Sequence, residues 1–190
     1  VKIDDNVSMK LIKIEDIREE AEYPGLRISI ETVLDKTKQT LQIDVTTGDI
    51  ITPQEINYSF KLMFEDRKIV IKAYNIETVL SEKLETIIVR GTTNTRMRDF
   101  YDIYTLLSDE SCSFVERNFI NAIKRTAAKR GSLEILKSEG DTALANVFKD
   151  SDIKNLWKIY TKKYSYAKNI EWDAINKSLM FLWNLCKDFL

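Results

Sequence analysis

The sequence predicts an α+β protein in which an antiparallel β-sheet is followed by a helical lobe. Two observations predict this class. Up to about residue 75, apolar and polar residues alternate between short polar turns, as they do in strands. Through the rest of the 190-residue chain, apolar residues recur at helical spacing. A chain whose strands come first and whose helices come later is typical of an α+β fold. The sequence contains no internal repeat.

The predicted strands are short and are joined by turns. Glu22-Tyr23-Pro24-Gly25 is predicted to be a turn, because Pro presets one backbone angle and Gly supplies another. A further polar turn is predicted at 35–37, so the first three strands form an antiparallel meander. The predicted strands are 7–17, 26–34, 40–46 and 68–74, with an irregular stretch at 53–63.

Residues 76–107 are predicted to form two helices joined by a tight turn. Gly91 ends the first helix, and Asn94 or Thr95 caps the second. On a helical wheel, Lys83 falls inside the apolar face of the first helix and Arg90 lies beside it. A helix that serves packing alone would carry these charges on its other side.

The second helix also turns charged residues inward. Arg96 lies within its apolar face and Asp99 lies at the edge, whereas Arg98 and Asp102 form a surface pair on the outer side. Burying an unpaired charge is costly, so the pattern indicates either a functional site or a buried salt-bridge network. In the first case Lys83 binds a phosphate or takes part in acid–base chemistry; in the second it pairs with Asp99 or Glu77.

The C-terminal part is predicted to be helical throughout. Ser113 is expected to cap a helix that runs to Arg130 and ends at Gly131, and Gly140 is expected to separate two short helices. These short helices are 133–138 and 142–149, and they are followed by helices at 152–164 and 172–190. We therefore divide the chain into a sheet region (1–75), a helix pair (76–110) and a helical lobe (111–190).

Lysines recur every four residues in the predicted helix 152–164, and aromatic residues lie between them. This pattern fits a patch for RNA phosphates with aromatic stacking, or a solvated face above an aromatic core, and we favour the second interpretation. The residues are Lys154, Lys158 and Lys162 with Trp157, Tyr160, Tyr164 and Tyr166; a second basic group comprises Lys124, Arg125, Lys129 and Arg130.

Composition limits the chemistry that is available. The net charge is −1. The sequence contains no histidine, and this excludes His-based zinc sites and Ser-His-Asp triads. Cys112 and Cys186 lie far apart and are expected to be reduced thiols. Any metal must therefore be held by oxygen ligands, which favours Mg²⁺ or Mn²⁺.

Asp44 lies between Ile43 and Val45 on a predicted strand. Its carboxylate could point toward a metal-bound phosphate, or it could lie on the solvent-exposed face of the strand.

Three stretches together resemble a known family. They are IETVLSEKLETIIVRGTTNTRMRDFYDIYTL, LQIDVTTGDIITP and the EYPG turn, and they span roughly residues 7–107. In this region the chain resembles the AbiEii/AbiGii-type nucleotidyltransferase toxins of type IV toxin–antitoxin systems. The resemblance implies a polymerase-β-like nucleotidyltransferase sheet, part of which is present, followed by a helical C-terminal lobe.

The resemblance also implies an activity and its partners. Such an enzyme would transfer a nucleoside monophosphate from an NTP to an acceptor such as tRNA, using Mg²⁺ or Mn²⁺. It would be cytoplasmic, without a membrane segment, and would act in abortive infection or phage defence beside a cognate antitoxin, which is often DNA-binding. The implied site residues are Lys83, Asp99 and Asp44 as catalytic, Arg96 and Arg98 as nucleotide-binding, and Asp44 as metal-binding. Arg90, which lies beside Lys83 on the helical wheel, is also predicted to bind the nucleotide.

The chain departs from the family pattern at its start. The family's early Gly-Ser motif and paired acidic residues have no match here, because Asp4-Asp5 has no Gly-Ser before it. The expected motif would precede Val1, so the chain is predicted to be inactive alone while its parent protein could be active. The alternative is a non-catalytic binding or interaction protein derived from the same fold, whose inward charges are structural.

Overall fold

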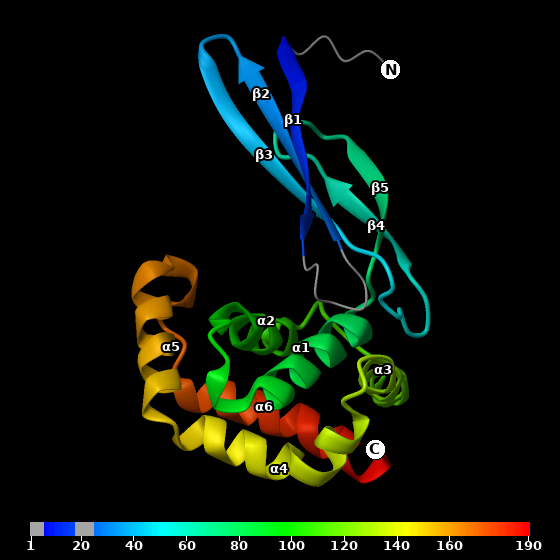
Figure 1. Ribbon diagram of the computed structural model, residues 1–190, viewed down its shortest axis with the longest axis vertical. Helices are drawn as coiled ribbons and strands as arrows, with labels where there is room; N and C mark the ends of the chain where they lie inside the picture. Colours follow the sequence, from blue (N-terminus) through cyan, green and yellow to red (C-terminus); the bar gives the residue numbers. More distant parts are fainter. Residues whose placement is uncertain (1–5, 18–24) are drawn as a thin grey trace. The chain divides into compact units, whose positions relative to one another are not determined.

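The computed structural model describes residues 6–17 and 25–190, which divide into two compact units, Val1–Asp49 and Ile50–Leu190 (Figure 1). The described elements are two small antiparallel sheets and the α-helices that follow them, which confirms the predicted α+β class. Of the predicted Glu22–Gly25 turn, only Gly25 falls within the described residues. The boundary at Asp49 differs from the predicted division at residue 75.

The first unit contains the predicted three-stranded meander. Strands β1 (Val7–Ile17), β2 (Gly25–Leu34) and β3 (Thr37–Val45) pair in that order, each antiparallel to the next. Asp35 begins the two-residue turn between β2 and β3 with a φ of 53°, a left-handed conformation that Asp tolerates better than most residues. The β1–β2 register shifts between Leu11 and Lys13, which indicates a β-bulge.

The alternation of the strands places apolar side chains on one face of this sheet. Ile28 pairs with Ile43, and Ile30 pairs with Leu41, as the period of two requires. Large apolar side chains of all three strands are exposed, and none of the hydrophobic side chains described in this unit is buried. This unit therefore contributes a sheet but no buried core among its described residues.

The second unit begins with a β-hairpin formed by β4 (Ile56–Lys61) and β5 (Lys68–Ala73). The predicted irregular stretch 53–63 was therefore wrong at β4. The signal for a strand was present, because the sequence INYSFK alternates apolar and polar residues. In the pairing, Tyr58 lies opposite Ile71 and Phe60 opposite Ile69, so the two strands share an apolar face.

Helix α1 (Ile76–Arg90) has the predicted bounds. The Asn75 side chain accepts a hydrogen bond from the Thr78 N–H, which caps the helix, and Gly91 ends it with a φ of 49°. A 3₁₀ turn, η1 (Gly91–Thr93), leads to α2 (Met97–Ser108), whose N-cap is Arg96. The predicted cap was therefore wrong, because the Asn94 Oδ1 instead accepts from the Arg96 N–H in the preceding turn.

Helix α3 (Glu116–Lys129) has Val115 as its N-cap and not the predicted Ser113. The expectation was wrong because a distant residue supplies the acceptor: the buried Glu77 carboxylate of α1 accepts the Val115 N–H at 2.9 Å. The C-terminus is as predicted, since Gly131 follows with a φ of 66°.

Helix α4 (Leu133–Lys149) is continuous, so the predicted break at Gly140 was wrong. Gly140 lies against Trp183 of α6 (Trp172–Cys186), and a Cβ at position 140 would come within 2.4 Å of the indole ring. The glycine therefore serves the close packing of two helices. Next to it, the Trp183 indole N–H donates to Asp141 at 2.7 Å, which holds the pKa of Asp141 below its usual value.

The remaining helix, α5 (Ser151–Lys163), is capped by Asp150, whose side chain accepts from the N–H groups of Asp152 and Ile153. It is followed by the 3₁₀ turn η2 (Ser165–Ala167), and α6 ends in η3 (Lys187–Phe189). The predicted helix 172–190 thus includes a last turn of 3₁₀ type, a common ending for a helix.

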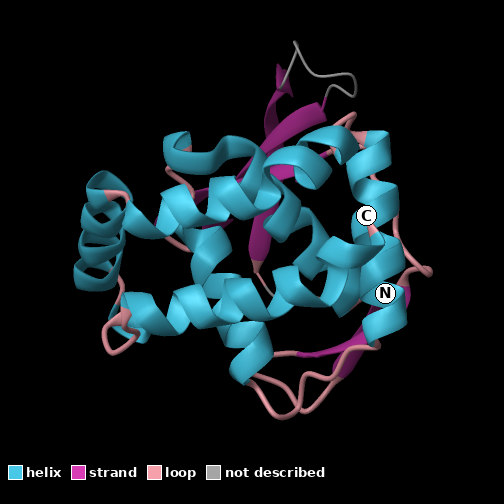
Figure 2. Ribbon diagram, turned by 90° about the horizontal axis from the view of Figure 1, so that it is seen from below, coloured by secondary structure: helices cyan, strands magenta, loops and turns pink. Residues whose placement is uncertain are grey.

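The helices of the second unit enclose one core, seen from below in Figure 2. Helix α1 contacts α2, α3 and α4, which makes it the central helix. The core includes Leu84, Phe100 and Cys186, and burial raises the pKa of the Cys186 thiol to about 12. Cys112 is half-buried, and both cysteines are free thiols, as predicted.

Within the described residues, no helix has the length and apolar content that a membrane span requires.

Candidate functional site

The charged residues that the sequence turned inward meet between α1 and α2. The Lys83 ammonium lies 2.9 Å from Asp99 Oδ1 and 2.7 Å from Asp102 Oδ2. Asp99 and Asp102 are three residues apart on α2, so both carboxylates face the same side of the helix. Lys83 therefore bridges two acids of the neighbouring helix. We call Lys83, Arg96, Arg98, Asp99 and Asp102 the α1–α2 network.

Two arginines complete this network on its outer side. Arg96 Nε lies 3.0 Å from Asp99 Oδ2, and Arg98 Nε lies 3.8 Å from Asp102 Oδ2. The exposed fraction of the side chain rises outward, from 4% for Asp99 to 51% for Arg96 and 78% for Arg98. The acids thus lie inside, and the two guanidinium groups reach into solvent.

The burial of Asp99 makes the network matter for stability. A buried charge left without its partner costs about 3–5 kcal/mol, whereas an exposed pair contributes little. Asp99 Oδ1 accepts a hydrogen bond from Lys83, but Oδ2 has no donor of suitable geometry within the described part of the chain, although Arg96 is near. A buried carboxylate oxygen without a hydrogen bond is unusual.

The network carries a surplus of positive charge. It contains three cationic side chains and two carboxylates, which leaves a net charge of +1. The exposed arginines are those best suited to recognise phosphate, because a guanidinium can donate two parallel hydrogen bonds. The chain as a whole has a net charge of −1, so the surplus is local. The arrangement suits an anionic ligand.

Arg90 also lies on α1, seven residues after Lys83, at the exposed end of the helix. Seven residues are about two helical turns, or roughly 10 Å along the axis, so both residues lie on the same side of α1. The role of Arg90 in nucleotide binding stays a prediction.

Asp44 belongs to the other unit. It pairs with Arg27 across β2 and β3, with Nε 2.7 Å from Oδ1 and Nη2 2.8 Å from Oδ2. This bidentate hydrogen bond raises the pKa of Arg27. The structure therefore unites Lys83, Asp99, Arg96 and Arg98 within the second unit. The predicted catalytic and metal-binding roles of Asp44 stay predictions.

The predicted Mg²⁺ or Mn²⁺ would need acidic side chains as ligands. Among residues 6–17 and 25–190, no three Asp, Glu or Cys side chains form a group that could bind a metal ion. Asp99 and Asp102 are occupied by Lys83, and Asp44 by Arg27. The metal requirement stays a prediction.

Asp102 plays a larger part than the sequence indicated. It was predicted to form only a surface pair with Arg98, but its shorter contact is with Lys83. The spacing of Asp99 and Asp102 could have revealed this, because two carboxylates at i and i+3 can share one ammonium. Of the two structural partners predicted for Lys83, Asp99 is the one observed, whereas Glu77 accepts from the Val115 N–H.

A second buried carboxylate, Glu85, was not singled out in the sequence. It accepts a hydrogen bond from the Ser132 hydroxyl at 2.6 Å and from Arg130 Nη1 at 2.8 Å. Both donors lie in the turn between α3 and α4. Glu77 and Glu85 therefore fix the beginning and the end of α3 to α1, which is a structural role.

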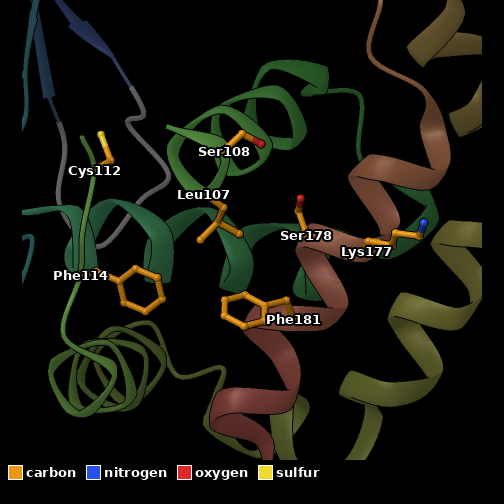
Figure 3. A pocket seen from close by; sticks show the side chains of 7 residues that line it. All are labelled: Leu107, Ser108, Cys112, Phe114, Lys177, Ser178 and Phe181. Carbon is orange, nitrogen blue, oxygen red and sulfur yellow. The ribbon is translucent and has the colours of Figure 1, made fainter. Parts of the chain in front are cut away.

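The described part of the second unit also has an open pocket of about 390 Å³, shown in Figure 3. Leu107 and Phe114 face Phe181 across it. None of its lining residues belongs to the α1–α2 network. The lining consists of Leu107, Ser108, Cys112, Phe114, Lys177, Ser178 and Phe181.

The fold indicates a class of protein. Two small antiparallel sheets followed by helices are consistent with a nucleotidyltransferase-like fold. The chain matches the model of the nucleotidyl transferase AbiEii toxin family of type IV TA systems over residues 3–179. It belongs to this family, which implies a cognate antitoxin. Neither the curated proteins nor the solved structures include a match to the chain.

Proposed function

We propose that the protein transfers a nucleoside monophosphate from an NTP to an RNA acceptor, with tRNA as the expected acceptor. The observation that carries this proposal is the α1–α2 network, in which buried Asp99 holds Lys83 beside two exposed arginines. Membership of the AbiEii family supports a nucleotidyltransferase. The nucleotide, the acceptor and the metal are parts of the proposal.

In the proposed reaction, a hydroxyl oxygen of the acceptor attacks the α-phosphorus of the NTP. A new P–O bond forms, the bond from the α-phosphorus to the bridging oxygen breaks, and pyrophosphate leaves with the bonding electrons. The hydroxyl proton passes to solvent or to a carboxylate. Since negative charge shifts onto the leaving pyrophosphate, cations placed around it lower the barrier.

Each residue of the network has a place in this proposal. Arg96 and Arg98 meet the triphosphate first, because their guanidinium groups are the most exposed. Lys83 then exchanges its contact with Asp102 for a phosphate oxygen. Asp99, which is 4% exposed, keeps the ammonium in position and is a positioning residue. Arg90 extends the cationic side of α1.

The test uses the protein in its natural full length. It is incubated with each labelled NTP, total tRNA and Mg²⁺ or Mn²⁺, beside a Lys83→Ala variant. Lys137→Ala is the matched control, since Lys137 is a surface lysine paired with Glu134 on α4. We expect labelled RNA with the natural protein and with the control, a loss of at least about 100-fold with Lys83→Ala, and loss on chelation of the metal.

A folded protein that labels no RNA, protein or nucleotide under these conditions would refute the proposal. The alternative function, a non-catalytic binding protein, is favoured by one observation: Lys83 already has two carboxylate partners. That alternative requires that Lys83→Ala lowers thermal stability while binding to the cognate antitoxin is retained. As expected for the family, the protein would act in the cytoplasm in defence against phage.

A further inference from the structure

Four tyrosines from α2, α5 and η2 come together in the second unit. We call Tyr101, Tyr160, Tyr164 and Tyr166 the tyrosine cluster. The ring centroids of Tyr101 and Tyr166 are 4.8 Å apart, and those of Tyr160 and Tyr164 are 4.7 Å apart. Tyr164 and Tyr166 are stacked at 5.4 Å with an angle of 24° between their planes.

The local structure explains how the cluster forms. Tyr160 and Tyr164 are four residues apart at the end of α5, and the turn η2 brings Tyr166 back over them. The Tyr160 and Tyr166 hydroxyls lie 3.1 Å apart. Burial and this hydrogen bond raise the pKa of Tyr160, so its hydroxyl stays protonated near neutral pH.

The cluster has a buried side and an open side. The buried Trp157 stacks against Tyr160 at 5.5 Å and joins the cluster to the core. On the open side, Tyr166 is 52% exposed, and the other three rings are half-buried. An exposed ring that rests on a fixed aromatic base costs little conformational entropy when a flat ligand stacks on it.

The segment that carries three of these tyrosines is strongly basic. Between Ile153 and Ile170 there are five lysines and no acidic residue, whereas the whole chain has a net charge of −1. Lys158, Lys162 and Lys163 are exposed, and the Lys163 ammonium lies 5.3 Å from the centre of the Tyr164 ring. Cations interleaved with exposed rings complement a ligand that has both phosphates and flat bases.

The tyrosine cluster lies beside the α1–α2 network. Tyr101 is on α2 between Arg98 and Asp102, and α5 packs against α2 (Figure 1). The charges of Asp102 and Arg98 both act on the Tyr160 hydroxyl. Asp102 in turn contacts Lys83 at 2.7 Å. A ligand that occupies the cluster would therefore lie beside the part of α2 that holds Lys83.

From this juxtaposition we infer that the tyrosine cluster and the lysines of α5 bind the single-stranded end of the RNA acceptor. The inference rests on the proposed function for the identity of that acceptor. Duplex RNA fits less well, because its bases are stacked in the helix and their faces are not available to tyrosines. A free nucleotide also fits less well, because Lys154 to Lys163 extend over about 14 Å, which is enough for several phosphates.

The first experiment measures binding alone. Fluorescence anisotropy of a labelled single-stranded RNA is recorded with the chain, with competition by the same RNA as a duplex and by ATP. We expect Tyr166→Ala to weaken binding about 10- to 100-fold and Tyr166→Phe to restore it, since stacking needs the ring and not the hydroxyl. Phe181→Ala is the matched control, because Phe181 is also 52% exposed but lies on α6.

The lysines are tested by salt dependence. Replacing Lys158, Lys162 and Lys163 by Gln should reduce the slope of log affinity against log salt by about two, because each phosphate contact contributes about 0.7 for a single strand. The thermal midpoint of each variant is measured to confirm folding. Equal binding by Tyr166→Ala and the natural chain, or a preference for duplex RNA or ATP, would overturn the inference.

A transfer assay separates this inference from the proposed function. In the natural full-length protein, Tyr166→Ala should raise KM for RNA and leave kcat and KM for the NTP unchanged. If RNA is labelled but Tyr166→Ala has no effect on KM, the inference fails and the proposed function stands. If no transfer occurs but anisotropy shows Tyr166-dependent binding of single-stranded RNA, the proposed function fails and the binding site stands.

Discussion

Asp99 is the most buried residue of the α1–α2 network. Its carboxylate is buried, and it holds Lys83 at 2.9 Å while Arg96 approaches from the solvent side. Its position in the first turn of α2 adds a favourable interaction with the helix dipole. Any change here affects both stability and the position of Lys83.

We predict that Asp99→Asn lowers the free energy of unfolding by about 2–4 kcal/mol. This is slightly less than the usual cost of breaking a buried ion pair, because Asp102 still holds Lys83. Urea denaturation followed by circular dichroism measures the change.

Asp173→Asn serves as the control for this prediction. Asp173 lies in the first turn of α6 and is exposed, so it shares the helix-dipole effect but not the buried pair. It should change the free energy of unfolding by about 1 kcal/mol or less. Equal effects of the two substitutions would show that the burial of Asp99 has no importance for stability.

The sequence could predict part of this site and not the rest. The wheel position of Lys83 follows from helical periodicity alone, and so does the inward position of Asp99. The pairing of Lys83 with Asp102 depends on how α1 and α2 cross, which no local pattern encodes. For the same reason Glu85 was missed, because its partners Arg130 and Ser132 are distant in sequence.

Helix α4 shows how packing can override a local signal. Glycine is a poor helix former, so its position in the middle of α4 costs about 1 kcal/mol relative to alanine. The helix continues because Trp183 of α6 covers Gly140 and because Asp141 accepts the indole N–H. The cost in helix propensity is offset by the close contact between α4 and α6.

We predict that Gly140→Ala destabilises the protein by about 1–3 kcal/mol, although alanine favours a helix. The added Cβ would lie 2.4 Å from two carbons of the Trp183 ring, so the helices must move apart. Urea denaturation is again the measurement. In a Trp183→Phe background, where those carbons are absent, the same substitution should be neutral or stabilising.

Ser138→Ala, on an exposed position of the same helix, is the control and should change stability by about 0.5 kcal/mol or less. Destabilisation by Gly140→Ala that is undiminished in the Trp183→Phe background would exclude the indole ring as the cause.

The elements themselves were largely predictable. The bounds of β1 and α1 follow from alternation, helical period and the Gly91 stop. The errors have tertiary causes: Val115 is the N-cap of α3 because Glu77 accepts its N–H, and α4 continues because of Trp183. β4 is different, since its alternation of apolar and polar residues is visible in the sequence and no tertiary contact is needed to explain it.

At the scale of the whole molecule, stability is unevenly distributed. Every buried hydrophobic residue described lies between Leu80 and Cys186, in the second unit. The three-stranded sheet of the first unit has an apolar face on which no described side chain is buried. Small sheets without a buried face are marginally stable in water.

We predict that a chain consisting of Ile50–Leu190 folds cooperatively on its own. Its thermal midpoint, followed by circular dichroism at the helical minimum, should fall within about 5 °C of that of the 190-residue chain, because the buried core is retained. The segment 1–49 alone should show no cooperative transition. Loss of the cooperative transition in Ile50–Leu190 would contradict the division.

The fold class was predictable at this scale, because strands precede helices in the sequence. The division between the units was not, since it falls after Asp49 and assigns the β4–β5 hairpin to the helical unit. A boundary of this kind depends on which residues contact one another and not on their pattern.

The contrast between the two cysteines has a practical consequence for spectroscopy. Cys186 is fully buried and its thiol has a pKa of about 12, so it remains unreactive toward maleimides at neutral pH. Cys112 is half-buried in the loop after α2. The natural sequence therefore accepts a single dye or spin label at Cys112. Distances from that label to a second one introduced on β3 would report how the two units are arranged in solution, without removal of any native residue from the core.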